Sequence, residues 1–298
     1  MTLGHEYNAM TGLERDSCHW LAYRYEDEEV GFRPEQGESW IGFSRGTQLN
    51  SSYGQRGWIT GLYQTDSKVW ASESAGRVYM NPALGLSKPW QTFQLEGVLR
   101  GVYGLSDDSV FTWGLHRGKP VAYHYDGSEW RPVATTGHIV GMHGASPDLI
   151  FAVGQKGYVA RWNGSDAFEP MSSAATGTLS DVHVESADEI YACGPDGELV
   201  QGTTHGWEPV LRHELALHCI TRWRDVVWVG GLDGLFKLED DKLVVAKDNL
   251  KPIRFDARGE LLITQPTYLV STLDGVAFSG IPLLTFSQVA ASRPPAWR

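Results

Sequence analysis

The sequence predicts an all-β chain that folds as a single β-propeller of four-stranded antiparallel blades. The main observation is a pattern of about forty residues that occurs twice within Val98–Gly177: LRGVYGLSDDSVFTWG precedes VAYHYDGSEWRPV, and IVGMHGASPDLIFAVG precedes YVARWNGSDAFEPM. Gly101 in the first copy matches Gly141 in the second, and Asp108 matches Asp148. Repeats of about 40 to 45 residues with four short strands each are typical of propeller blades.

The same register extends the repeat to six units. Gly61, Asp181, Cys219 and Arg254 occupy the equivalent position, at spacings of 35 to 40 residues. Each unit begins with a short alternating run and continues with a β-rich run such as LIFAVG, EIYACG or VVWVGG. Runs of this kind between Gly-containing turns predict strands. An aromatic residue opens the fourth strand of several units, at Trp90, Trp130, Phe168 and Trp207.

A seventh blade is expected from the N-terminal segment, and six blades are the alternative. The predicted blades are 13–47, 58–97, 98–137, 138–177, 178–215, 216–250 and 251–282. In the first blade, HWLAYRY, VGFRP and SWIGF are interpreted as the second, third and fourth strands, with Gln48–Gly57 as a polar connection. The missing first strand is assigned to the C-terminal run 283–291, since closure of a propeller covers its open strand edges. Residues Tyr7–Leu13 are the alternative, and 293–298 are expected to form a frayed tail.

Bulk properties are consistent with one globular domain of 298 residues. The start of the chain lacks the basic and apolar regions of a signal peptide, and no apolar run is long enough for a membrane span. The three cysteines are scattered, and Cys193 and Cys219 fall within predicted strands, which predicts buried thiols in a reducing cytoplasm. A formal charge of −11 disfavours a nucleic-acid partner and favours a basic one, although solubility alone is also a sufficient explanation.

No motif for catalysis is present. The sequence lacks GxSxG, HExxH, a phosphate-binding loop, a dinucleotide fingerprint and CxxC. We therefore expect no enzyme activity and no cofactor. Aspartates that precede glycine are more often turn formers than catalysts.

One column of side chains is a weak chemical candidate. Tyr63, Tyr103, His143 and His183 occupy the same position in four consecutive units, so they are expected near the central channel. The two histidines would be able to share a metal ion or a proton. Packing between blades is the favoured interpretation, because two ligands without a third do not make a metal site, and no metal is predicted.

Acidic residues recur in the turns that should share one face of the propeller. These are the turns between first and second strands and between third and fourth strands. The candidate partner-binding residues are Asp66, Asp107, Asp108, Asp148, Asp188, Glu189, Asp225, Glu239, Asp240 and Asp241, with Glu35, Glu38 and Asp126 in the same set of turns. Clustered carboxylates attract basic partners and bond to Arg and Lys.

The repeat, read as L-x-G-V-x-G-x-S-x-D-x-V/I-F-A-V-G with a later W/Y-x-G-x-x-W, resembles those of bacterial propellers related to photosystem II assembly factors and of sialidase-like propellers. The resemblance covers roughly residues 58–280 and implies architecture only. Catalytic sialidases would imply an arginine triad, a Tyr nucleophile and Asp boxes, but STLDGVAF and YDGSEW are degenerate and no arginine set is found. The assembly factors are exported, whereas this sequence shows no export signal.

We therefore predict a non-catalytic, cytoplasmic propeller that binds a basic protein. The sharper hypothesis is an immunity-type inhibitor that occludes a basic toxin or effector domain. A carbohydrate-binding or carbohydrate-processing propeller is the alternative, for which 12 Trp and 12 Tyr would supply stacking surfaces, and an assembly scaffold is a further one.

Overall fold

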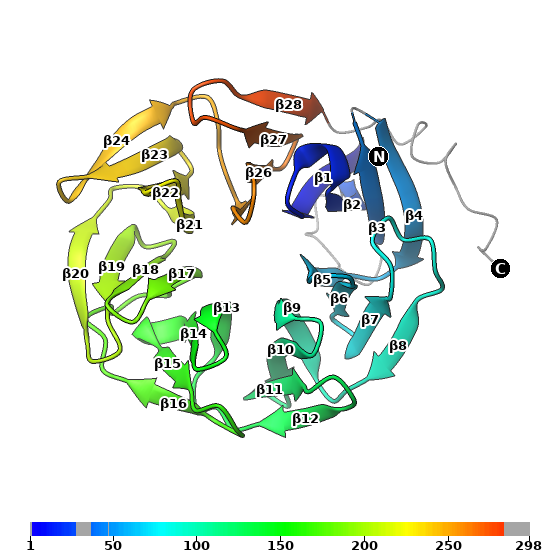
Figure 1. The fold of residues 1–298 in the computed structure, drawn as a ribbon, viewed down its shortest axis with the longest axis horizontal. Helices are drawn as coiled ribbons and strands as arrows, with labels where there is room; N and C mark the ends of the chain where they lie inside the picture. The colour runs from blue at the N-terminus through cyan, green and yellow to red at the C-terminus, as the bar shows by residue number, and fades with distance from the viewer. Residues whose placement is uncertain (1, 28–36, 47, 283–298) are drawn as a thin grey trace. The chain divides into compact units, whose positions relative to one another are not determined.

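The structure, a computed structural model, describes residues 2–27, 37–46 and 48–282. These residues form seven four-stranded antiparallel sheets, and each sheet uses four strands that are consecutive in the sequence (Figure 1). The helices among them are short 3₁₀ turns, η1 (Arg15–Ser17) and η3 (Gln155–Gly157). None of the described helices has the length and hydropathy needed to cross a membrane. The fold is a seven-bladed β-propeller, which confirms the fold class that the repeat predicts.

The sheets belong to two compact units. Unit 2, Glu96–Ile253, contains four sheets. Their strands are β9 (Val98–Ser106), β10 (Ser109–His116), β11 (Lys119–Tyr125) and β12 (Trp130–Val133); β13 (Ile139–Ser146), β14 (Leu149–Gly154), β15 (Val159–Trp162) and β16 (Phe168–Met171); β17 (Asp181–Ser186), β18 (Glu189–Cys193), β19 (Glu198–Gly202) and β20 (Trp207–Arg212); β21 (Leu217–Trp223), β22 (Val226–Gly231), β23 (Gly234–Glu239) and β24 (Lys242–Lys247).

Unit 1, Met1–Leu95 with Arg254–Arg298, contains the other three sheets. Their strands are β1 (Thr2–Thr11), β2 (His19–Asp27), β3 (Glu38–Arg45) and β4 (Gln48–Arg56); β5 (Ile59–Gln64), β6 (Val69–Glu73), β7 (Arg77–Asn81) and β8 (Gln91–Gln94); β25 (Arg254–Asp256), β26 (Leu261–Gln265), β27 (Tyr268–Thr272) and β28 (Ser279–Pro282). The strands of six of the seven sheets lie within the residue ranges that the repeat gives.

The first sheet differs from the prediction. Its first strand is β1, which overlaps the alternative Tyr7–Leu13, whereas the run 283–291 lies outside the described residues. SWIGF is in the third strand rather than the fourth, and the fourth strand is β4, within the stretch interpreted as a connection. The segment VGFRP, predicted as the third strand, is also outside the described residues. Because β4 is the outer strand of its sheet, its polar residues QLNSSYGQR suit an edge that faces solvent.

The β-rich runs of the repeat are the second strands, and they are the most buried. All residues of β6 and β26 are buried, and β14 and β22 have one half-buried residue each. A second strand lies between two strands of its own sheet and has packed residues on both faces, so its sequence is continuously apolar rather than alternating. In the outer strands β16 and β20, by contrast, half of the residues are exposed and only the first residue is buried. The core is therefore built between neighbouring sheets, with the second strands at its centre.

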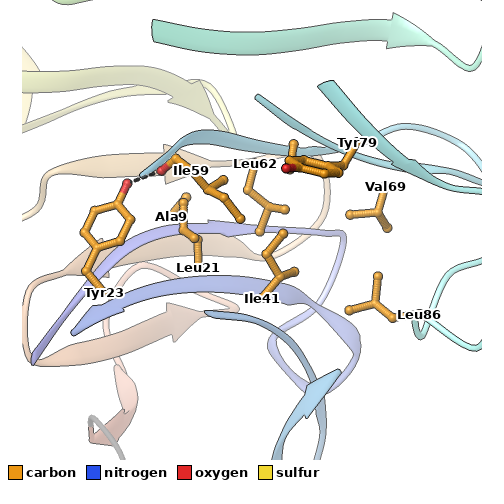
Figure 2. Close-up of a cluster of buried hydrophobic side chains, with 10 residues drawn as sticks. Ala9, Leu21, Tyr23, Ile41, Ile59, Leu62, Val69, Tyr79 and Leu86 are labelled. Atoms are coloured by element: carbon orange, nitrogen blue, oxygen red, sulfur yellow. Dashed lines mark hydrogen bonds between the residues drawn. The ribbon is translucent and has the colours of Figure 1, made fainter. Parts of the chain in front are cut away.

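Figure 2 shows this packing between the first two sheets of unit 1. Leu21 and Ile41 of the first sheet face Ile59 and Leu62 of the next, and all four are buried. The Tyr23 hydroxyl donates a hydrogen bond to the carbonyl of Ile59 (Figure 2). Burial raises the pKa of Tyr23 well above its ordinary value, so the hydroxyl keeps the proton that it donates.

A buried ionic network joins the first and last sheets of unit 1. The carboxylate of Asp256 in β25 accepts hydrogen bonds from the Thr11 hydroxyl at 2.8 Å and from the backbone N–H of Gly12 at 3.0 Å. The Arg258 guanidinium lies 2.6 Å from the same oxygen. Burial by itself would raise the pKa of Asp256, but Arg258 and these hydrogen bonds hold it below its ordinary value. Residues about 245 positions apart in the chain are thus fixed to each other by a charged side chain.

Candidate functional site

The predicted acidic residues of unit 2 lie in exposed turns. Asp108, Asp148, Asp188 and Asp225 are exposed and sit between the first and second strands of four successive sheets. Asp107 is half-buried beside Asp108. Because the four sheets have the same strand order, these turns occupy corresponding positions in each sheet. The side-chain contacts place some of the carboxylates in two groups.

The larger group surrounds one arginine. Arg222 in β21 lies 2.8 Å from Glu185 at the end of β17, 3.3 Å from Glu189 at the start of β18, and 3.1 Å from Asp225 in the next turn. We call Arg222 with Glu185, Glu189 and Asp225 the Arg222 cluster. One guanidinium binds three carboxylates, so the cluster keeps a net negative charge while its side chains are held in place.

Tyr191 connects the cluster to the next acidic turn. Its hydroxyl donates a hydrogen bond to Glu189 at 3.2 Å. Burial, followed by the charge of Glu189, raises the pKa of Tyr191 to about 12, and the charge of Asp241 adds to this shift. Asp241, in the turn between β23 and β24, is therefore close enough to act on the same side chain. Glu239 and Asp240 are exposed neighbours in that turn.

A smaller group forms around Asp108. The glycine of the following turn, Gly127, lies against the Asp108 side chain, and the charges of Asp108 and Asp126 both raise the pKa of Tyr125, after burial. Asp126 accepts hydrogen bonds from the backbone N–H groups of Ser128 and Glu129, each at 3.0 Å, so it closes its own turn. Arg131 lies 3.0 Å from Asp126.

Among the described residues, the predicted positions Asp66, Asp148, Asp188 and Glu38 fall outside both groups. Asp148 is exposed, and its backbone carbonyl accepts a hydrogen bond from Arg161. Asp66 is exposed in the β5–β6 turn of unit 1. Glu38 begins β3, after the second-to-third connection, and pairs with Arg24 at 3.3 Å, so it does not belong to the predicted set of turns. Its assignment changes because SWIGF is a third strand. Glu35 lies outside the described residues.

The tyrosine and histidine column makes hydrogen bonds between neighbouring sheets. The Tyr103 hydroxyl donates to the carbonyl of Gly144 and accepts from its N–H, both at 2.9 Å. His143 Nδ1 accepts from the N–H of Val184 at 3.0 Å. His183 Nδ1 lies 3.3 Å from the Thr221 hydroxyl. Each of these three side chains thus contacts the first strand of the following sheet.

Asp256 continues the pattern in unit 1, because it holds the equivalent register position in β25 and accepts hydrogen bonds from Thr11 at the end of β1 and from Gly12 after it. Tyr63, also in unit 1, packs its ring under the Arg258 guanidinium at 4.7 Å. The chemical groups differ along the column, but in several sheets a side chain at this position of the first strand bonds to the first strand of another sheet. These contacts favour the packing interpretation of the column over a catalytic one.

The two histidines stack on each other, with ring centroids 4.7 Å apart. His183 Nε2 lies 3.2 Å from Glu185 of the Arg222 cluster. Burial, with a further contribution from the Arg222 charge, lowers the pKa of His183 to about 4. In the part of the chain that the structure describes, no three His, Cys, Asp or Glu side chains are grouped as a metal site would need.

A groove of about 880 Å³ lies beside the acidic turns of unit 2. Gln201, Thr203, His205, Glu208 and Asp241 are among the residues that line it. Its polar groups come from β19, β20 and the turn between them, from the β23–β24 turn, and from Ser172 and Ser173 after β16. Spacing along the sequence does not reveal this groove, because its walls come from three separate parts of the chain.

Solved structures with similar folds are β-propellers. The structure described as YCF48 bound to D1 peptide has a TM-score of 0.62 and 14% identity, over 87% of this chain and 88% of that chain. The WD40 propeller domain of Doa1 has a TM-score of 0.63 and 12% identity, over 97% and 100%. The C-terminal WD40 domain of Sif2 has a TM-score of 0.60 and 13% identity, over 95% and 97%. At these identities the similarity shows the fold. No protein-family model and no curated protein sequence matches the chain.

Proposed function

We propose that this propeller binds a basic protein through the Arg222 cluster and the acidic turns next to it. The observation that carries the proposal is the arrangement of three carboxylates around one arginine. Arg222 is largely covered, with 23% of its side chain exposed, whereas Asp225 is 91% exposed. Glu185 and Glu189 are 38% and 31% exposed, so the cation is held among the carboxylates, and Asp225 extends furthest into the solvent. A partner's Lys or Arg side chains would complete their charge-assisted hydrogen bonds.

The surroundings of the cluster support a basic partner. The nearby turn Glu239–Asp241 adds three carboxylates, and the net charge of −11 attracts cationic partners over a longer range. The polar groove that includes Asp241 has room for the long side chain of a lysine or arginine. A propeller of similar fold is described as bound to a peptide, which shows that the architecture is compatible with peptide recognition.

The finer proposal is an inhibitor that covers the cationic site of a toxin or effector domain. An acidic surface without catalytic motifs suits this function, because an inhibitor acts by binding the cationic groups of its target rather than by catalysing a reaction. Cys18, Cys193 and Cys219 are buried and form no disulfide with one another, which fits a protein that works in a reducing cytoplasm. An assembly scaffold would use the same surface, with a stable rather than a transient complex.

The structure offers little to a carbohydrate partner. Eight tryptophans are buried to 6% exposure or less: Trp20, Trp40, Trp70, Trp113, Trp162, Trp207, Trp223 and Trp228. Sugar stacking requires an exposed indole face, and these rings are in the core. Trp58, Trp90 and Trp130 are half-buried, so the tryptophans support a glycan partner less than the carboxylates support a basic one.

The test is capture of bound proteins from the native cells, followed by titration of the captured partner against variants. The triple variant Glu189→Gln, Asp225→Gly and Asp241→Gly removes three charges. Asp225 and Asp241 have positive φ angles of 61° and 58°, so glycine at these positions relieves backbone strain. Glu189→Gln removes a partner of Arg222, so urea unfolding of the triple variant verifies that the fold is intact.

We expect the triple variant to weaken binding by at least about tenfold, and we expect wild-type binding to weaken with salt. Asp66→Asn is the matched control, because Asp66 is an exposed turn residue of unit 1. A partner without basic character, or equal affinities for wild type and triple variant, would refute the proposal. The covering of a toxin site is tested separately, by inhibition of the partner's own activity.

A further inference from the structure

The outer strand β24 differs from the other outer strands of unit 2. The third residue of β12, β16 and β20 is a proline: Pro132, Pro170 and Pro209. Proline removes a backbone donor, and on an edge strand it hinders the addition of another strand. β24 reads KLVVAK and contains no proline, and its third residue is Val244. β24 is the one outer strand of unit 2 that has no proline to hinder the addition of another strand.

β24 also exposes apolar side chains at its open edge. Val244 is 43% exposed and Val245 is 58% exposed. They are consecutive in a strand, so they point to opposite faces, and both faces of the edge are apolar at this point. Buried apolar residues of the neighbouring strand, such as Phe236 opposite Val245, do not cover them.

The turn before β24 determines which backbone groups face outward. Asp240 and Asp241 both have positive φ, 48° and 58°, and Glu239 pairs with Lys242, which together define a two-residue hairpin of type I′. In such a hairpin the flanking pair is hydrogen-bonded, and the pairs alternate from there to Phe236–Val245, after which Ala246 is bulged and the register shifts. The N–H and C=O groups of Leu243 and Val245 therefore point away from β23. Among the described residues, neither makes a backbone hydrogen bond outside its sheet.

We propose that this edge pairs with β24 of a second copy of the chain, in an antiparallel register centred on Val244. In this register Val244 lies opposite Val244 of the second copy, and Leu243 lies opposite Val245 of the second copy. The outward-facing groups of Leu243 and Val245 then bond to each other across the two-fold axis. The two sheets become one eight-stranded sheet, with apolar side chains paired on both faces.

Charge complementarity favours a second copy as the occupant. Edge lysines normally oppose strand pairing, and β24 has Lys242 and Lys247. In the proposed register, Lys247 of each copy faces the Glu239–Asp241 turn of the other, so opposite charges meet at both ends. Lys242 faces Ala246 of the second copy. No pair of like charges is opposed along the strand.

A strand of six residues forms a small interface, so the dimer is expected to be weak. The charge of −11 on each copy adds repulsion at low ionic strength. At about 0.15 M salt this long-range repulsion is screened beyond about 8 Å, whereas the paired strands remain in contact. Self-association should therefore increase with salt over this range, in contrast to the binding of a basic partner.

The experiment is sedimentation equilibrium of the purified chain at concentrations from about 10 µM to about 1 mM, a range that suits a weak complex. We expect the average mass to rise from 33.0 kDa toward twice that value. Val244→Lys and Val244→Glu each place like charges at the two-fold axis, and each should raise the dimer dissociation constant by at least about tenfold. An equimolar mixture of the two variants should dimerise again, because opposite charges then meet.

Val98→Lys is the matched control, since Val98 is an exposed valine of β9, 49% exposed, and it should dimerise like the wild type. Thermal unfolding of each variant verifies that the fold is intact. A wild type that stays at 33.0 kDa throughout would overturn the proposal, and so would a mixture of the two Val244 variants that stays monomeric. A monomer that instead captures an unrelated protein at this edge, lost on Val244→Lys, would likewise overturn self-pairing.

Discussion

The stability of unit 2 should depend on pH through His183. The side chain is 8% exposed, stacks on His143 and lies between Thr221 and Glu185. Burial first, then the charge of Arg222, lowers the pKa of His183 to about 4 from an ordinary value of 6.5. The folded protein therefore keeps His183 neutral at pH 7, although Glu185 is a potential partner for the charged form.

The sign follows from proton binding in the two states. Between about pH 6.5 and pH 4 the unfolded chain takes up a proton at His183 that the folded chain does not, so the free energy of unfolding falls as the pH falls. The difference between the two pKa values corresponds to about 3 kcal/mol. Above about pH 6.5 neither state is protonated, and below about pH 4 both are, so the effect is confined to this window.

Urea unfolding at several pH values between 7 and 4 measures the effect, with wild type and His183→Gln compared at each pH. The variant should be less stable at pH 7, because it loses the stacking and the fit of the ring. Its deficit should shrink by up to about 3 kcal/mol by pH 4, because the variant has no proton to take up at this position.

Val184→Ala provides the comparison substitution. Val184 neighbours His183 on β17 and is 2% exposed, but it does not titrate, so its deficit should stay constant with pH. If the loss in free energy of unfolding caused by His183→Gln is also constant from pH 7 to pH 4, then His183 has the same pKa in the folded and the unfolded state. The description of His183 as a buried neutral contact between sheets would then be wrong.

Three further substitutions test packing and charge, each by urea unfolding at pH 7. Asp256→Asn should destabilise the protein by about 3 kcal/mol, because it leaves its arginine partner without a counter-charge in a mostly buried network. Asp241→Gly should stabilise it by about 0.5 to 1 kcal/mol, because φ is 58° there and glycine accepts this conformation without strain. Gly101→Ala should cost about 1 to 3 kcal/mol, since a Cβ would lie 2.3 Å from the Trp113 ring, whereas Gly206→Ala has open space and should change little.

The repeat was sufficient to predict six of the seven sheets, because their buried second strands carry a continuous apolar run and their turns carry glycine. In the first sheet only β2 carries the apolar signal, in the buried run His19–Tyr23. Its first strand follows no repeat position, and its fourth strand, QLNSSYGQR, contains the polar residues that an outer edge tolerates. Polarity in an outer strand and polarity in a loop look alike in a sequence, so the residues of β4 do not distinguish a strand from a connection.

For the site, the sequence indicates which turns contain Asp and Glu residues, but not which side chains contact these carboxylates. Repeat equivalence placed His143 and His183 on neighbouring strands, and their rings do stack. Arg222 was missed because its contacts cross from one sheet to another, which spacing along the chain does not reveal. One signal was present: Arg222 follows the column position occupied by Thr221, and the residues at the corresponding positions after Tyr63, Tyr103, His143 and His183 are uncharged.

His183 and Arg222 connect the contacts between sheets to the proposed binding surface. Both are partners of Glu185, at 3.2 Å and 2.8 Å respectively. A protonated His183 would compete with Arg222 for this carboxylate, but the pKa of about 4 keeps the histidine neutral near pH 7, so Glu185 is then bound by Arg222 alone. The geometry of the three carboxylates is therefore constant near neutral pH. Acid would disturb the sheet contacts and the carboxylates together, whereas salt would weaken the attraction of a partner and leave the buried contacts intact.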